Sequence, residues 1–173
     1  MKEKFPNFDP DQKIQLVNKI LPMVPEHNTY IELFSGAESI PLYWEKPKSS
    51  ISVLNDIRNE FSVFYQQSHL NYSDLIEKIK ATPNSEKTFN FARIVLEFTE
   101  FFSNLDKAWA TWFLSQNLKG YKTENIEESI NHMIDYLEKI QLEYRHPEYV
   151  LKIRDTEEAL FFIDPPFINN KNE

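Results

Sequence analysis

The sequence predicts an α/β protein with a mostly parallel sheet. Short apolar runs alternate along the chain with longer stretches of helical periodicity, which is the order expected when helices connect parallel strands. Two of the apolar runs end in polar residues: the run 51–54 is followed by Asn55 and Asp56, and the run 159–163 by Asp164. Ligands bind beyond the carboxyl ends of parallel strands, so these residues mark the edge where a site is expected.

The individual elements follow from periodicity, caps and breakers. Strands are predicted over 29–34, 51–54, 140–144 and 159–163. Helices are predicted over 12–21, 36–44, 60–69, 73–81, 86–102, 106–117, 126–137 and 147–153. Ser73 is expected to cap its helix, and Asn125 with Glu128 forms a capping-box pattern. The chain is therefore expected to be one domain over 1–173, with a helical insert over about 70–138 between the second and third strands.

Composition narrows the classes of protein. A chain of 173 residues can bury roughly 70% of the surface that its unfolded form exposes, which suits a single folded domain. No apolar run approaches the roughly 20 residues that cross a bilayer, and no signal peptide is evident, so we expect a cytoplasmic protein without membrane contact. The absence of cysteine excludes disulfides and thiolate chemistry, and the histidines show no metal-ligand spacing. The formal charge of −8 opposes a polyanion at long range, so contact with nucleic acid would have to be local.

The most informative motif follows the last predicted strand. Asp164, Pro165, Pro166 and Phe167 place a carboxylate, two rigid prolines and an aromatic ring at a strand's carboxyl end. Prolines lack backbone donors and restrict the preceding residue to extended geometry, so carbonyls and side chains there have fixed directions. The motif is consistent with a site, although a strand that simply ends in prolines is the structural alternative.

Together with two other stretches, this motif resembles the Dam-like adenine-specific DNA methyltransferases. DPPF matches their catalytic [D/N/S]PP[Y/F/W] motif, YIELFSGAES resembles their first cofactor motif, and SVLNDI resembles their strand ending in Asn-Asp. The motifs occur in the family's order, and the likeness runs from about Phe5 to Phe167. The resemblance implies a Rossmann-like methyltransferase sheet and methyl transfer from S-adenosylmethionine to the exocyclic amine of adenine in double-stranded DNA.

The resemblance also implies a role for each motif residue. Asp164 would accept hydrogen bonds from the adenine amine together with the Pro165 carbonyl, and Phe167 would stack on a base flipped out of the duplex. Asp56 would hold the ribose hydroxyls of S-adenosylmethionine. Pro166 completes the catalytic motif. The other implied cofactor contacts are Lys13, Glu32, Phe34, Ser35, Gly36, Ala37, Asn55, Ile57 and His146.

Three positions depart from the family's pattern. Glu38 replaces the second glycine of the first motif, where a side chain takes up space beside the cofactor. Asp11-Gln12-Lys13 stands where the family has Gly-Gly-Lys, and His146 stands where it has an aspartate. The departures indicate either a reshaped cofactor pocket or the loss of methyl transfer. A catalytically inactive binding or assembly protein, and a methyltransferase of another amine, are therefore the alternative functions.

The insert and the end of the chain carry two further expectations. Trp109, Trp112 and Phe113 either stack on bases or belong to the core. The nearby phosphate-contact candidates are Lys119, Tyr121 and Lys122. The chain ends just beyond the catalytic motif, whereas the family continues with further strands. The last strand is therefore expected at a sheet edge, which either a longer native product or a second chain would complete.

Overall fold

A parallel sheet forms one side of the molecule. The structure is a computed structural model that describes residues 18–36, 49–118 and 125–165. Its strands are β1 (Thr29–Glu32), β2 (Ile51–Asn55), β3 (Gln141–Glu143) and β4 (Ala159–Phe162). In the described residues they form one four-stranded sheet in the order β3-β2-β1-β4, and every pair is parallel. The predicted α/β fold with a Rossmann-like parallel sheet is confirmed.

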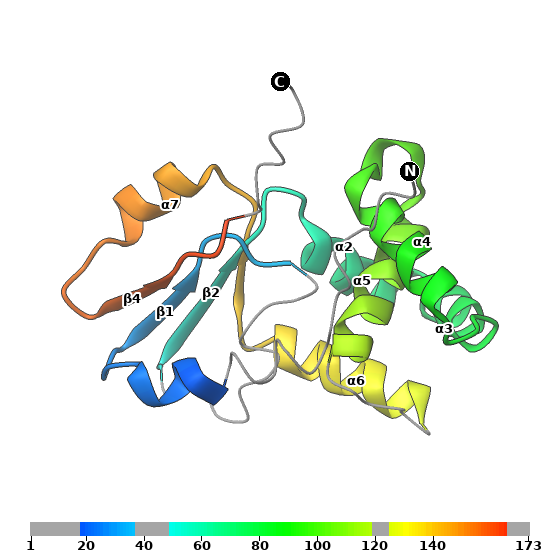
Figure 1. Cartoon of the computed structure of the whole chain (residues 1–173), viewed down its shortest axis with the longest axis horizontal. Helices are drawn as coiled ribbons and strands as arrows, with labels where there is room; N and C mark the ends of the chain where they lie inside the picture. The colour runs from blue at the N-terminus through cyan, green and yellow to red at the C-terminus, as the bar shows by residue number, and fades with distance from the viewer. Residues whose placement is uncertain (1–17, 37–48, 119–124, 166–173) are drawn as a thin grey trace, which may run out of the picture.

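Helices lie on both sides of this sheet (Figure 1). Between β2 and β3 the chain forms α2 (Glu60–Leu70), α3 (Tyr72–Lys80), α4 (Glu86–Glu97), the 3-10 turn η3 (Thr99–Phe101), α5 (Asn104–Leu118) and α6 (Ile126–Leu137). Between β3 and β4 lies α7 (Pro147–Arg154), and the 3-10 turn η1 (Leu21–Met23) precedes β1. The predicted helical insert between the second and third strands is therefore present. No helix in the described part of the chain is long and apolar enough to cross a membrane.

The core is divided between the two faces of the sheet. Successive side chains of a strand point to opposite faces, and in β2 Val53 and Leu54 are both buried. Val53 belongs to a small cluster with Ile31 and Leu33 of the β1 segment and Val150 of α7. Leu54 joins a much larger cluster formed by the insert helices. Both faces are thus covered, as the apolar character of these parallel strands requires.

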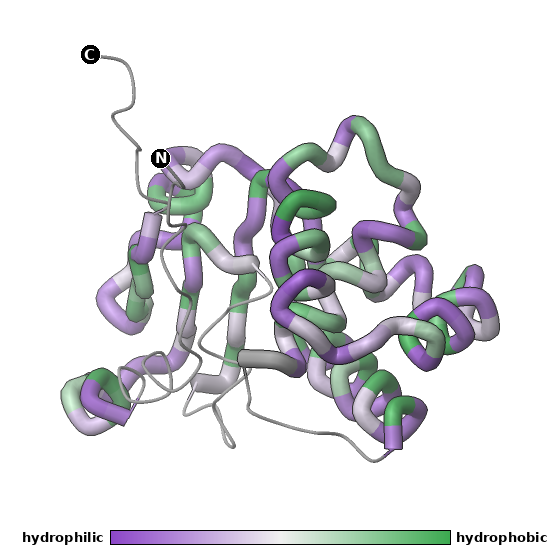
Figure 2. The backbone as a smooth tube through the Cα atoms, turned by 45° about the vertical axis from the view of Figure 1, so that its right-hand side comes forward, coloured by the Kyte–Doolittle hydropathy of each residue, from purple (hydrophilic) through white to green (hydrophobic). Residues whose placement is uncertain are grey.

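The central helix of the insert is α5. Every residue from Ala108 to Gln116 is buried, because α2, α3 and α4 all pack around this helix. In Figure 2 apolar segments of the tube accordingly run through the interior of the helical part. Trp109, Trp112 and Phe113 are only 3%, 6% and 4% exposed, so the core interpretation of these aromatics is confirmed. Lys119, Tyr121 and Lys122 lie outside the described residues.

Several predicted boundaries need correction. Ser73 lies inside α3 and does not cap it. Helix α2 ends at Leu70, and α3 begins at Tyr72 with Asn71 as its N-cap residue. The helix expected over 86–102 ends at Glu97, and the 3-10 turn that follows lets Phe102 pack edge-on against Phe91. The first strand ends at Glu32, and the described part of the first helix runs only over 18–20.

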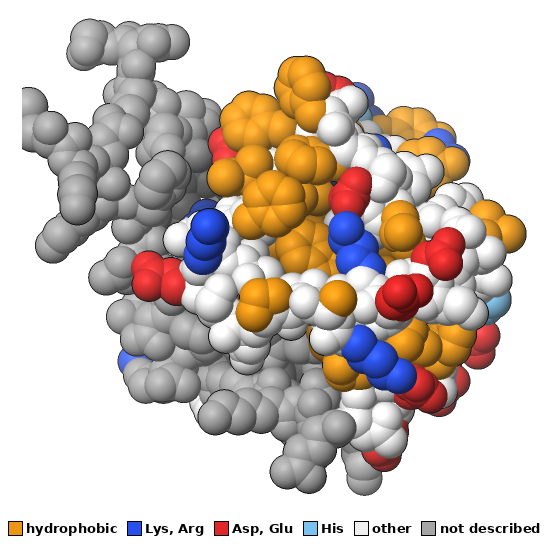
Figure 3. Space-filling view, turned by 90° about the vertical axis from the view of Figure 1, so that its right-hand side faces the viewer, with side chains coloured by type: hydrophobic (Ala, Val, Ile, Leu, Met, Phe, Trp, Pro, Cys, Tyr) orange, Lys and Arg blue, Asp and Glu red, His pale blue; other side chains and the backbone are white. Residues whose placement is uncertain are grey.

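The outer side of the insert carries an apolar surface. Phe91, Ile94, Phe98 and Phe101 of the α4 to η3 segment are between 45% and 77% exposed. Figure 3 faces this side of the molecule and shows hydrophobic side chains gathered on it. Since α4 also buries Ala92, Val95 and Leu96, this helix has apolar residues on both its inner and its outer side.

Candidate active site

The carboxyl ends of the strands meet at one edge of the sheet. The Leu33 N–H donates to the Phe162 carbonyl at 3.1 Å, and the Ser35 N–H donates to the Asn55 carbonyl at 2.9 Å. These bonds continue the strand pairing into the loops, so the loops after β4, β1 and β2 lie side by side. The predicted site residues on these loops and on the loop after β3 include Asp164, Pro165, Ser35, Gly36, Asp56 and His146.

Asn55 ties three of these chain segments together. Its side-chain amide donates to the carbonyls of Leu33 and Arg145, each at 3.0 Å. Its side-chain oxygen accepts from the Arg145 N–H at 2.9 Å. The residue is completely buried, and both amide hydrogens are engaged. Asn55 therefore fixes the relative positions of the loops after β1, β2 and β3, and the contact with a cofactor implied for it stays a prediction.

Asp56 follows Asn55 and is 7% exposed. Its two carboxylate oxygens accept from the backbone N–H groups of Arg58, at 3.0 Å, and Glu60, at 3.2 Å. Burial raises the pKa of Asp56 above the usual value of an aspartate, while these hydrogen bonds and the Arg58 charge act in the opposite direction. The carboxylate is thus held in place at the start of α2, and each oxygen keeps a second lone pair for a ligand hydroxyl.

Next to Asp56, a pair of charged side chains lies against the glycine turn after β1. The Glu60 side chain is 1% exposed, and its Oε1 lies 2.9 Å from Nη2 of Arg58. A Cβ atom at Gly36 would lie 3.3 Å from Glu60 Oε2 and 3.4 Å from Arg58 Nη2. A side chain at position 36 would therefore crowd the pair, so this close approach favours glycine. Sequence reasoning missed Arg58 and Glu60, although charged residues directly after a motif aspartate were a usable signal.

A small polar cavity lies beneath this edge, between the turn after β1, the start of α2 and the end of β3. Its volume is about 10 Å³, room for about one water molecule. Among the described residues Ser35 Oγ and Asn59 Oδ1 are buried there without a hydrogen-bond partner. Asn59 has the left-handed backbone conformation, with φ 59°, which asparagine adopts more readily than most residues.

A third buried carboxylate lies at the end of β1. Glu32 is 4% exposed and accepts a hydrogen bond from the Tyr30 hydroxyl at 3.2 Å. Burial, together with the Glu32 charge, raises the pKa of both Tyr30 and Tyr136 far above the usual tyrosine value. Both phenols therefore stay protonated and can serve as donors near Glu32.

The remaining predicted site residues differ in accessibility. Asp164 and Pro165 are exposed directly after β4, and Ile57 is 66% exposed beside Asp56. His146 is exposed, and its carbonyl accepts from the N–H groups of Tyr149 and Val150 in the first turn of α7. Phe34 is half-buried against the small cluster on the sheet. Lys13, Ala37, Glu38, Pro166 and Phe167 lie outside the described residues.

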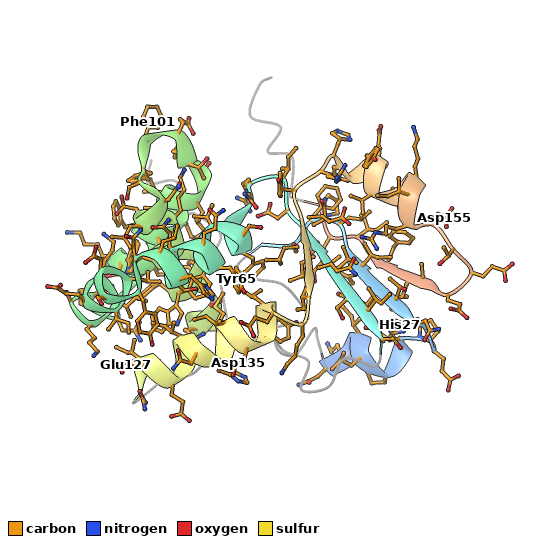
Figure 4. All side chains as sticks on the ribbon, turned by 180° about the vertical axis from the view of Figure 1, so that it is seen from behind. His27, Tyr65, Phe101, Glu127, Asp135 and Asp155 are labelled. Carbon is orange, nitrogen blue, oxygen red and sulfur yellow. The ribbon has the colours of Figure 1, made fainter. Side chains whose placement is uncertain are left out.

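A second, wider hollow in the described part of the chain lies elsewhere. It is a shallow concavity of about 460 Å³ on α6, lined by Asn125, Glu127, Glu128, Asn131, His132 and Asp135. Figure 4 labels Glu127 and Asp135 on this helix, away from the carboxyl ends of the strands. Its exposed carboxylates would repel phosphate groups, and no predicted site residue lines it. His132 is exposed there.

Comparisons with known proteins show to which family this chain belongs. The comparison with curated proteins gave no match. A family model described as D12 class N6 adenine-specific DNA methyltransferase matches residues 12–115. The match contains the glycine turn and Asp56, and it ends before β3, β4 and Asp164. Since this match covers more than half of the chain, the protein belongs to the D12 class N6 adenine-specific DNA methyltransferase family.

Proposed function

We propose that this chain transfers a methyl group from S-adenosylmethionine to the exocyclic amine of adenine in double-stranded DNA. Membership of the family supports the class of reaction. The observation that carries the proposal is the register of β1 and β4, which pairs Glu32 with Phe162. The loop of Asp164 and Pro165 is consequently adjacent to the glycine turn, as a reaction between a cofactor and a base requires.

The residues at the sheet edge fit this cofactor chemically. Asp56 presents a fixed carboxylate to ribose hydroxyls, and the exposed Ile57 offers an apolar surface to an adenine ring. Ser35 stays a proposed contact from the family resemblance, although its Oγ is buried beneath the turn. S-adenosylmethionine would supply the activated methyl group, bonded to a positively charged sulfur. Lys13 and His146 stay proposed contacts from the family resemblance.

In this proposal the exposed carboxylate of Asp164 accepts a hydrogen bond from the target amine. Pro165 has no N–H, so its backbone offers only the carbonyl, which accepts from the second amine hydrogen. Both acceptors orient the nitrogen lone pair toward the methyl group, and the rate gain comes from this positioning. Pro166 would fix the direction of the loop, and Phe167 would stack on the flipped adenine.

The decisive experiment combines binding with transfer. Calorimetry with S-adenosylmethionine is expected to show binding, and labelled methyl groups are expected to enter adenine-containing duplexes. Asp164→Ala is expected to abolish transfer while leaving cofactor binding in place. Asp155→Ala is the matched control, since Asp155 is exposed but lies before β4, away from the site (Figure 4). Transfer that survives in Asp164→Ala would contradict the proposed role.

A catalytically inactive binding or assembly protein is the second candidate function. It is favoured by Arg58 and Glu60, whose side chains lie against Gly36, where a cofactor would have to approach. Calorimetry separates the two functions: no heat at millimolar S-adenosylmethionine, in the wild-type chain and in variants of Arg58, would support the inactive relative.

A further inference from the structure

We propose that Arg58 is a latch that closes the glycine turn after β1 and has to swing away before S-adenosylmethionine can bind. This inference rests on the proposed function, because it concerns access to the same cofactor. It assigns a role to a side chain that none of the recognised motifs includes.

The latch is held by two carboxylates. Nη2 of Arg58 lies 2.9 Å from Oε1 of Glu60, and Nε lies 3.8 Å from Oδ1 of Asp56. Glu60 and Asp56 have side chains that are 1% and 9% exposed, so both are fixed within the fold. One guanidinium group therefore bridges two nearly buried acids at the start of α2.

The bridge lies where a ligand has to approach. Arg58 Nη2 comes within 3.4 Å of the place that a Cβ atom would take at Gly36, so the guanidinium group lies directly against the glycine. The same group lies beside the Asp56 carboxylate, the predicted partner of the ribose. A cofactor bound to both Gly36 and Asp56 would compete with the Arg58 side chain for the same space.

The latch can open because only one of its ends is buried. The Arg58 side chain is 50% exposed, whereas Glu60 is enclosed. Solvent reaches the Arg58 end of the pair, so salt screens the pair in part, and a long side chain can leave it by rotamer changes alone. The cofactor binds only to molecules in which the latch is open. The apparent affinity for the cofactor therefore falls in proportion to the fraction of molecules in which the latch is shut.

The test compares cofactor affinities by calorimetry. Arg58→Met keeps an unbranched aliphatic stem and removes the guanidinium group with its charge, and it is expected to bind S-adenosylmethionine roughly three- to tenfold more tightly than the wild type. Lys80→Met is the matched control, since the Lys80 side chain is 53% exposed and pairs with Glu127 at 2.7 Å on the insert. The control is expected to bind as the wild type does. Raising the salt concentration should bring the wild type closer to Arg58→Met, since salt weakens the latch.

Two outcomes would overturn the latch alone. Equal affinity in the wild type and Arg58→Met would show that the side chain does not compete, and weaker binding in the variant would make Arg58 a cofactor ligand. If Arg58→Met is unstable because Glu60 is left without its cation, the double variant Arg58→Met with Glu60→Gln removes both charges and is also expected to bind more tightly than the wild type. Absence of binding in every variant would instead refute the proposed function, and the latch with it.

Discussion

At the scale of single residues, Asn55 shows how one buried side chain holds the site together. Replacing Asn55 by Ala leaves the Leu33 carbonyl and both the N–H and the carbonyl of Arg145 without their partner. We expect the free energy of unfolding to fall by about 2–3 kcal/mol, since buried polar groups lose their hydrogen bonds. Urea denaturation measures the change. The control is Asn90→Ala, at an exposed position of α4. An equal loss of unfolding free energy in the two variants would contradict the structural role of Asn55.

The sequence located the residues of this edge but not their contacts. Asp56 and Gly36 follow strand ends, and a strand end can be recognised from an apolar run and the polar residue after it. The positions of Arg58 and Glu60 depend instead on which rotamers meet across two loops, which no spacing pattern encodes. The hydrogen bonds of Asn55 likewise join residues up to 90 positions apart.

At the scale of elements, α5 begins with a reciprocal cap. The Asp106 carboxylate accepts from the N–H and the hydroxyl of Ser103, and the Ser103 hydroxyl accepts from the Asp106 N–H. Lys78 also forms an ion pair with Asp106 at 2.8 Å. Burial acts to raise the pKa of Asp106, but the hydrogen bonds from Lys78 and Ser103 and the Lys78 charge outweigh it and hold this pKa below the usual value.

A lowered pKa in the folded state stabilises the fold only while the carboxylate is charged. Asp106→Asn is therefore expected to lower the free energy of unfolding by about 1 kcal/mol at pH 7, the usual effect of a lost cap. The pKa of an aspartate in the unfolded chain is about 3.9. The difference in free energy of unfolding between the variant and the wild type should shrink as the pH falls below this value and through the lower pKa of Asp106 in the folded state. Denaturation at several pH values measures it, with Asp74→Asn on the exposed side of α3 as the control. A difference that does not depend on pH would contradict the charge-based explanation.

The end of α4 could not be predicted from periodicity. The stretch 86–117 contains neither glycine nor proline, and its apolar residues continue at helical spacing through the break at Phe98. The break is set by the packing of Phe102 against Phe91, together with the local cap of Ser103 and Asp106 that starts α5. The cap of α6 is also local, and the predicted hydrogen bond from the Glu128 N–H to Asn125 is present.

At the scale of the whole molecule, the two clusters of the core differ in size. The larger cluster joins all the insert helices to Leu54 of β2, whereas Val150 of α7 packs in a cluster of four buried residues on the sheet. In the described part of the chain β4 pairs only with β1, and all its residues are half-buried. The alternation of strands and helices in the sequence predicted a parallel sheet. The order of the strands within that sheet could be read only from the hydrogen bonds between them.

This difference predicts that the sheet side opens before the insert. Val150→Ala and Val95→Ala remove the same atoms from completely buried positions, one in each cluster. Hydrogen exchange measured by mass spectrometry is expected to show faster exchange in α7 and β4 for Val150→Ala, with α5 unchanged, because small clusters open locally. Val95→Ala should instead accelerate exchange in α5 and the helices around it, since they share one core. If Val150→Ala accelerated α5 as strongly as β4, the two clusters would form a single cooperative unit and the predicted order of opening would be wrong.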